Sequence, residues 1–265
     1  MISGTLKRPM PISPTQYKLN KIVILNPKGG CGKSTLATNL AACYAQRGVA
    51  TAIMDFDPQG STMAWLKRRP ADLPTIHGIA AFKKSMQATR SWQLRVPNDT
   101  VNLIVDSAAG ITHDDLREIT RDATTILVPV LPSSMDIDAA SRCIADLLLV
   151  AKVDRNERKL AVVANRTRKN TKSLGRLMRF LDTLGIPIIA VLRDSQNFVR
   201  SAELGIGLHE MQPHRVRHDV EQLDRIARWL DGWSDRRKSA ASITGIRRQS
   251  FSKVSILRRP QTGPA

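Results

Sequence analysis

Residues 22–35 read IVILNPKGGCGKST, and the architecture of the whole chain can be inferred from them. An apolar run, 22–25, leads into a glycine-rich loop, 28–34, and a helix-compatible segment, 35–46, follows. Glycines between a buried strand and a helix start allow backbone N–H groups to surround an anion. Lys33 adds a positive charge near the outer phosphates, and Ser34 adds an oxygen for Mg²⁺. This phosphate loop, residues 28–34, therefore predicts a site for a nucleoside triphosphate.

The composition is that of a globular protein. With 265 residues, of which 42% are hydrophobic, the chain is long enough for one large α/β domain with tails. It has no run of eighteen apolar residues and no signal-peptide pattern, so we expect a soluble cytoplasmic protein. Cys31, Cys43 and Cys143 are far apart in sequence, which argues against a disulfide framework or a cysteine-bound metal.

The formal net charge of +18 points to nucleic acid or an anionic membrane surface as a partner. Residues 236–265 carry eight basic and no acidic side chains, and we expect a basic, disordered tail there. Residues 1–20 contain three prolines and no acidic residue, which predicts a flexible leader. The folded nucleotide-binding domain is expected over 21–235.

Short apolar runs alternate with helix-compatible segments along this domain. Strands are predicted at 22–25, 50–54, 101–105, 125–130, 160–164 and 186–192, and helices at 35–46, from 61, 79–89, 134–150, 173–184 and 214–233. This alternation predicts the α/β class, with a mostly parallel, doubly wound sheet flanked by helices. In such a sheet the ligand lies at the carboxyl ends of the strands.

Acidic residues stand at two of these strand ends. Asp55 and Asp57 are two apart, so in an extended segment their carboxylates share one face. One carboxylate could support Mg²⁺ while the other orients a water for in-line attack; the alternative is that an Asp before a proline caps a turn. Asp106 ends the third predicted strand. We predict that Ser34, Asp55 and Asp106 hold Mg²⁺.

The phosphate loop departs from the standard pattern, because Pro27 replaces the first glycine and Lys28 precedes the glycine pair. This KGGCGKS form, together with DFDPQG at 55–60, resembles the deviant Walker A and second motifs of the ParA/MinD ATPases. The resemblance covers roughly 20–240 and implies a deviant Walker A P-loop NTPase that binds ATP and Mg²⁺. Seven consecutive residues would hold the phosphates: Gly29, Gly30, Cys31, Gly32, Lys33, Ser34 and Thr35.

The resemblance also assigns roles in hydrolysis of ATP to ADP and phosphate. Lys28 would reach across a dimer interface to the partner's nucleotide, whereas a lone lysine beside a glycine loop is otherwise a solvated charge. Lys33 would bind the outer phosphates, and Asp57 would orient the attacking water. The implied activity is weak on its own and stimulated by DNA and by a cargo adaptor.

Three positions differ from the family pattern or have a second interpretation. After Asp106 the family reads Asp-x-Pro-Pro-Gly, but both prolines are absent here, and Gly110 remains available to donate an amide. Asn165 resembles the adenine-contacting position, with Arg166 following it; the alternative is an asparagine in a strand-end turn. The segment 191–193 lacks the proline that the family has beside the base.

Basic residues in the second half of the domain are candidates for DNA contact. Three of them recur at i, i+4 and i+7, as one stripe of a helix. No aromatic residues lie between them, which disfavours stacking on single-stranded bases. Salt-sensitive, sequence-independent contact with duplex phosphates is the expectation, against the alternative of a solvated face. The candidates are Arg168, Lys169, Lys172, Arg176, Arg179, Arg200, Arg225 and Arg228.

The family implies three partners: a second copy of the chain when ATP is bound, nonspecific double-stranded DNA, and a cargo adaptor of the McdB or ParB type. The chain lacks the long N-terminal domain of the repressor members, and it is most similar to short members that position carboxysomes over the nucleoid. Plasmid or chromosome partition is the alternative, and a DNA-coating protein without turnover is another. Association with membrane, as in MinD, is not expected, because Gly245 and several serines disfavour an amphipathic helix in the tail.

Overall fold

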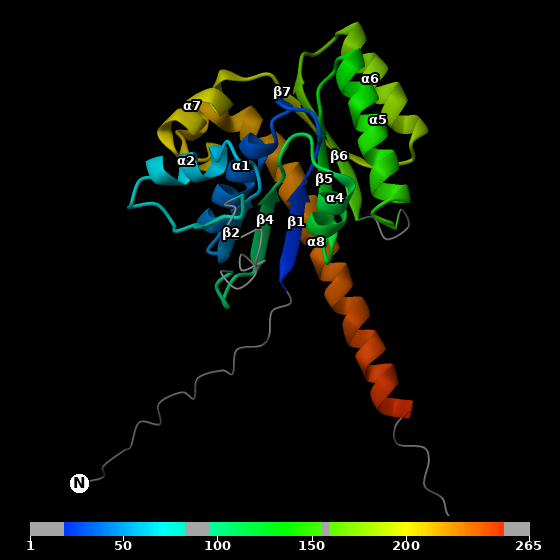
Figure 1. Cartoon of the computed structure of the whole chain (residues 1–265). Helices are drawn as coiled ribbons and strands as arrows, with labels where there is room; N and C mark the ends of the chain where they lie inside the picture. The colour runs from blue at the N-terminus through cyan, green and yellow to red at the C-terminus, as the bar shows by residue number, and fades with distance from the viewer. Residues whose placement is uncertain (1–18, 83–95, 155–158, 252–265) are drawn as a thin grey trace, which may run out of the picture.

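Seven parallel strands form one sheet in the computed structural model, which describes residues 19–82, 96–154 and 159–251 (Figure 1). The strand order is β3-β2-β4-β1-β5-β6-β7. The strands are β1 (Asn20–Ile24), β2 (Thr51–Asp55), β3 (His77–Ala80), β4 (Asn102–Asp106), β5 (Thr125–Val130), β6 (Leu160–Thr167) and β7 (Ile188–Arg193). Each of the six predicted strands is present, and the predicted parallel α/β architecture is confirmed.

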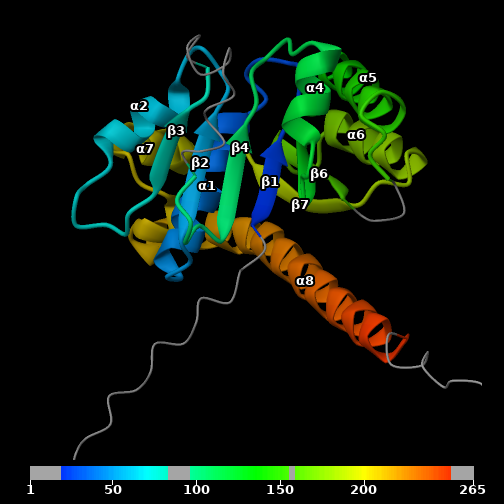
Figure 2. The same cartoon turned by 60° about the horizontal axis from the view of Figure 1, so that its bottom comes forward.

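Helices cover both faces of this sheet, as Figure 2 shows. They are α1 (Lys33–Gln46), α2 (Ser61–Arg68), α4 (His113–Thr120), α5 (Ser134–Leu149), α6 (Lys172–Thr183), α7 (Gln196–Leu204) and α8 (Pro213–Phe251), with a short 3₁₀ turn, η2 (Leu208–Glu210). Alternate side chains of β1 explain this layering. Ile22 and Ile24 join the core beneath α1, α2 and α8, while Val23 and Leu25 join the core beneath α4, α5 and α6. A strand buried on both faces reads as a continuous apolar run.

The sheet register brings the strand ends of the candidate site together. Asp106 at the end of β4 lies beside Ile24 of β1 on one side and beside Asp55 of β2 on the other. The phosphate loop leaves β1 at this same edge. The central position of β1 and β4 therefore places two carboxylates next to the glycine-rich loop.

One predicted helix differs from the structure, and two helices of the structure were not predicted. The predicted helix at 79–89 is wrong at its start, because residues 77–80 form β3, which pairs in parallel with β2; residues 83–95 lie outside the described part. The hydrophobic periodicity around the buried Ile79 does not distinguish a short buried strand from the start of a helix. Helices α4 and α7 were not predicted, although the capping box of Thr112 and Asp115 is a readable signal for α4.

Helix α8 extends well beyond its predicted end at Trp233. It continues to Phe251, so the prediction of a disordered tail over 236–265 is wrong for 236–251, while 252–265 lie outside the described residues, as do 1–18 of the predicted leader. Arginine, lysine and alanine have high helix propensity, and the next proline is Pro260. Both views show the end of α8 projecting beyond the sheet (Figures 1 and 2). In the described part of the chain, no helix has the length and apolar character needed to cross a membrane.

Candidate nucleotide-binding site

The phosphate loop has a backbone that requires glycine. Gly30 and Gly32 have φ angles of 76° and 94°, and Gly32 is the residue that caps the N-terminus of α1. A Cβ atom on Gly32 would lie 2.2 Å from the side-chain nitrogen of Asn165. The loop thus approaches β6 closely and presents the free amides of a helix N-terminus, which is the arrangement that binds phosphate.

Two asparagine side chains, Asn26 after β1 and Asn165 in β6, hold the loop in place. The Asn26 amide donates to the Pro129 carbonyl at 2.8 Å, and its oxygen accepts from the backbone N–H of Lys28 at 2.9 Å. The Asn165 amide donates to the Cys31 carbonyl at 2.8 Å. Asn165, which is predicted to contact adenine, supports the phosphate loop in this structure. Buried asparagines with both ends bonded make the loop rigid before a ligand arrives.

The two lysines of the loop point in different directions. Lys33 is buried, its Nζ donates to the Lys28 carbonyl at 3.2 Å, and it lines the hollow above the loop. The Nζ of Lys28 instead lies 3.5 Å from a carboxylate oxygen of Asp136, in the first turn of α5. Lys33 is thus placed for phosphate in the same subunit, while Lys28 is paired with a neighbouring carboxylate.

Asp106 is a fully buried carboxyl group at the end of β4. Its side chain is 0% exposed, and neither oxygen has a partner of good geometry in the described part of the chain. Burial raises the pKa of Asp106 to about 7, although the nearby Ser34 hydroxyl opposes this shift. An unpaired buried carboxylate beside a hydroxyl is a set of oxygens that suits a hard cation, so Ser34 and Asp106 fit Mg²⁺.

Asp55 is also buried, but its oxygens are occupied. One accepts from the Thr62 hydroxyl at 2.6 Å, and the other accepts from the backbone N–H of Asp57 at 2.9 Å. Burial raises the pKa of Asp55, and these hydrogen bonds counteract the increase. Asp55 therefore shapes the turn that carries Asp57, and Asp57 lines the same hollow as Lys33 and Ser34.

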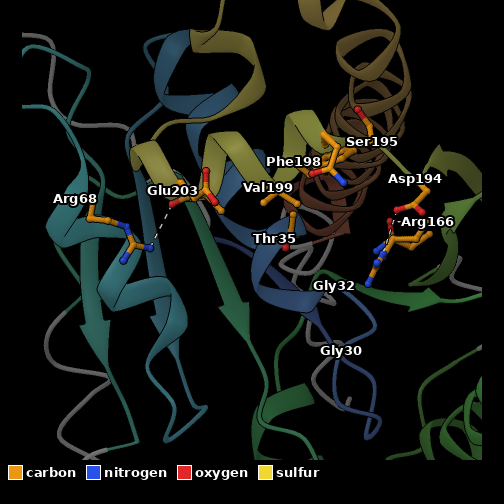
Figure 3. Close-up of a pocket in the computed structure, with 13 residues that line it drawn as sticks. Gly30, Gly32, Thr35, Arg68, Arg166, Asp194, Ser195, Phe198, Val199 and Glu203 are labelled. Carbon is orange, nitrogen blue, oxygen red and sulfur yellow. Dashed lines mark hydrogen bonds and ion pairs between the residues drawn. The ribbon is translucent and has the colours of Figure 1, made fainter.

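Two adjoining hollows lie over the phosphate loop. The smaller, about 400 Å³, is lined by the loop with Asp57 and Ala109. The larger, about 660 Å³, is lined by the loop, Asn165, Arg166 and the segment 194–203 (Figure 3). Both hollows are lined by Gly30, Gly32, Thr35, Arg68 and Ala202. Together they have the size of a small-molecule site.

Gly110 is placed differently from its prediction. Its backbone N–H, expected to be available for a phosphate, donates to the Pro27 carbonyl at 2.9 Å. Gly110 has a positive φ of 67°. The neighbouring residue Ala109, and not Gly110, lines the smaller hollow. The amide is therefore not free in this structure.

Sequence reasoning missed the wall formed by residues 194–203. Asp194, Ser195, Phe198 and Val199 line the larger hollow, and Asp194 lies 3.4 Å from the guanidinium of Arg166. Figure 3 shows these side chains arranged around the hollow, opposite the phosphate loop. This segment follows the last predicted strand at the carboxyl edge, and that position was the available signal.

The predicted DNA-contacting residues are all exposed but do not form one patch. Lys172, Arg176 and Arg179 lie on the solvent side of α6, opposite its buried residues. Arg225 and Arg228 lie on α8, which packs on the other face of the sheet. The two groups therefore flank the β7 edge of the sheet. The remaining three are Arg168, which pairs with Asp194, Lys169, and Arg200 on α7.

Comparison with known proteins also indicates a nucleotide-binding site. Residues 22–208 match the model of the CobQ/CobB/MinD/ParA nucleotide binding domain. The chain is 27% identical to maintenance of carboxysome distribution protein A of Halothiobacillus neapolitanus over 210 residues, 77% of this chain and 93% of that protein. It is 26% identical to the protein of the same name from Gloeobacter kilaueensis over 224 residues, 83% and 98% of the two chains.

The fold also matches a solved structure. The apo McdA structure from Cyanthece superposes with a TM-score of 0.63 at 14% identity, covering 78% of this chain and 98% of that chain. At this identity the match concerns the fold alone.

Proposed function

The chain belongs to the CobQ/CobB/MinD/ParA nucleotide-binding family, and on this basis we propose that it is a ParA-type ATPase that positions carboxysomes over the nucleoid. Two relatives that match more than three quarters of this chain carry the name maintenance of carboxysome distribution protein A. The observation that carries the catalytic part is the unpaired, buried Asp106 beside a preformed phosphate loop. The loop suits a phosphate group, and the unpaired carboxylate beside it suits a cation bound to that phosphate.

The chemistry follows from where the side chains lie. Loop amides from 29–35 and the buried Lys33 bind the phosphates of ATP. Ser34 and Asp106 would hold Mg²⁺, which would neutralise charge on the phosphate oxygens. Asp57 orients a water toward the γ-phosphorus, and the bond to the β–γ bridging oxygen breaks to give ADP and phosphate. Asp55 positions Asp57 through the hydrogen bond between them.

We propose that Lys28 converts ATP binding into dimerisation. The Lys28 side chain is 32% exposed, so its ammonium is accessible to a second subunit once it leaves Asp136. A γ-phosphate between two subunits would then stabilise the dimer with ATP and not with ADP. Arg166 and Asn165 would contact the nucleoside from the larger hollow.

The ATP-bound dimer would hold duplex DNA through basic residues that flank the β7 edge. Pairing two subunits doubles these exposed charges, which raises affinity for the phosphate backbone without sequence preference. An adaptor on the cargo, of the McdB or ParB type, would stimulate hydrolysis and release the subunits from the nucleoid. The cytoplasm is the expected compartment.

Purified protein tests this proposal in two measurements. Light scattering should show a dimer with ATP and Mg²⁺ and a monomer with ADP, and DNA co-sedimentation should follow the dimer. Lys33→Ala, which removes the phosphate-binding charge, is the matched control and should abolish both. Equal DNA affinity with ATP and ADP would refute the nucleotide-gated cycle.

Two further assays separate the alternatives. Turnover that rises on addition of duplex DNA distinguishes an ATPase from a DNA-coating protein without turnover. Pelleting with anionic vesicles in the absence of DNA would instead favour a MinD-like protein. This assay is relevant because α8 is helical as far as Phe251, and a helix is the form in which a basic segment binds a membrane surface. Fluorescent protein in the native host should redistribute with carboxysomes; movement with a plasmid or chromosome origin would favour partition.

A further inference from the structure

One buried carboxylate on α8 holds the segment that walls the larger hollow. Asp219 is 0% exposed, and its two oxygens accept hydrogen bonds from three residues at the end of β7 and the start of α7. Arg193 donates to both oxygens, through Nε to one and at 2.9 Å to the other. The Ser195 hydroxyl donates at 3.0 Å and the Asn197 amide at 2.6 Å. Four donors thus converge on one side chain.

The charged form of Asp219 is the one that the fold selects. Burial alone would raise the pKa of Asp219, but the bonds from Arg193, Asn197 and Ser195 outweigh it and hold the pKa below its usual value. The same contact raises the pKa of Arg193. A buried carboxylate of this kind is stable only while its donors stay in place, so Asp219 fixes the positions of those donors.

One of these donor residues belongs to the wall of the hollow itself. Ser195 lines the hollow and also caps the N-terminus of α7, from which Phe198 and Val199 face the same space. Gln222, one turn further along α8, accepts from the backbone N–H of Arg193 at 3.0 Å. The first turns of α8 are therefore the support on which the wall is built, although Asp219 itself does not line the hollow.

The phosphate end of the site is supported independently. Its braces are the bonds of Asn26 and Asn165 to the loop, and none of the bonds described for Asp219 involves that loop. A change at Asp219 should therefore affect only the part of a ligand that extends beyond the loop. For a nucleotide, that part is the nucleoside.

We propose that Asp219 is a positioning residue for the nucleoside end of the site, an inference that rests on the proposed nucleotide-binding function. Asp219 fixes the 193–197 turn, and this turn places the wall of the larger hollow against the base and ribose. The phosphate loop and Asp57 carry the chemistry and do not depend on it.

The test separates the two ends of the ligand. Asp219→Asn keeps the size of the side chain but removes its charge and replaces one acceptor by a donor. We expect about tenfold weaker binding of ATP and ADP by calorimetry with Mg²⁺, since loss of one charged hydrogen bond is of that order. Inorganic tripolyphosphate, which has no nucleoside, should bind as it does to the unaltered chain, and kcat at saturating ATP should be unchanged.

Two controls accompany this variant. Asp224→Asn removes a carboxylate from the same helix that pairs with Arg47 and His209 away from the hollow, and it should bind all three ligands normally. Asn197→Ala removes one donor and should give the same selective loss, smaller in size. It keeps the proposal testable if Asp219→Asn does not fold.

The outcomes are distinguishable. Unchanged ATP affinity in Asp219→Asn and Asn197→Ala, or an equal loss for tripolyphosphate, would overturn the positioning role while leaving the proposed function intact. Absence of ATP binding by the unaltered chain would instead refute the proposed function.

Discussion

The Lys28 ammonium lies 3.5 Å from a carboxylate oxygen of Asp136, a side chain that is only 7% exposed. The other Asp136 oxygen is hydrogen-bonded to Ser133, the residue that caps α5. Breaking the Lys28 pair leaves a buried carboxylate without its counterion, which is unfavourable. The proposed movement of Lys28 to a partner's nucleotide therefore competes with a contact inside its own subunit.

Asp136→Asn should lower the ATP concentration needed for dimerisation, by roughly threefold to tenfold. The amide retains a partner for Ser133 but no longer holds the Lys28 charge. Sedimentation velocity across an ATP titration measures the midpoint. Asp138→Asn, an exposed carboxylate on the same helix, is the control, and a midpoint equal to that of the unaltered chain would show that the pair does not restrain Lys28.

Lys28→Ala should remain monomeric with ATP while still binding it. Lys28 does not line either hollow, and Lys33 stays in place to bind phosphate in the same subunit. Light scattering and calorimetry on one preparation separate the two properties. Normal dimerisation and hydrolysis in this variant would be incompatible with a bridging lysine.

Gly32→Ala should destabilise the fold and abolish nucleotide binding. The new Cβ would lie 2.2 Å from Asn165 and the residue would keep a φ of 94°, strain worth on the order of 1–3 kcal/mol. Thermal unfolding should fall by about 4 to 10 °C. Gly29→Ala is the matched control for stability, because a Cβ there meets nothing within 4 Å, and equal melting of the two variants would contradict the close approach.

Asp106→Asn should stabilise the nucleotide-free protein at pH 8 and leave it unchanged at pH 4. Burial raises the pKa of Asp106 to about 7, so the folded chain binds a proton that the unfolded chain releases between pH 4 and 7. Stability from this group is therefore present at low pH and lost as pH rises through 7, at about 1.4 kcal/mol for each tenfold difference in proton affinity.

The readout is the free energy of unfolding from urea titrations at both pH values. Asp55, whose pKa burial also raises, adds a pH dependence of the same sign in both proteins. A variant less stable than the unaltered chain at pH 8 would indicate that Asp106 has a partner after all. ATP hydrolysis should be lost in the same variant.

Charge reversal at Arg176 and Arg179 should weaken DNA binding and reduce its salt dependence. Both side chains are exposed on α6 and line neither hollow. Reversal at Arg225 and Arg228 tests the other side of the β7 edge. Co-sedimentation with ATP at several salt concentrations shows which group contacts DNA, and no effect from either pair would place the DNA surface elsewhere.

Local sequence was sufficient for six of the seven strands and for the phosphate loop. The apolar runs have the length of strands buried on both faces, and glycines 30 and 32 occur where the backbone must take a positive φ. Both signals are local, because they depend on a few consecutive residues. They also located Asp55, Asp57, Asp106 and Asn165 at one edge of the sheet.

Tertiary structure alone decided which partner each polar group has. Asp136 pairs with Lys28 across 108 positions in the sequence, and the Gly110 amide is taken by Pro27. Asp219 comes to Arg193 only because α8 packs beside β7. Ion pairs and hydrogen bonds act over a few ångströms in space and leave no periodic pattern in sequence, so only the packed chain shows which groups are free to bind a ligand.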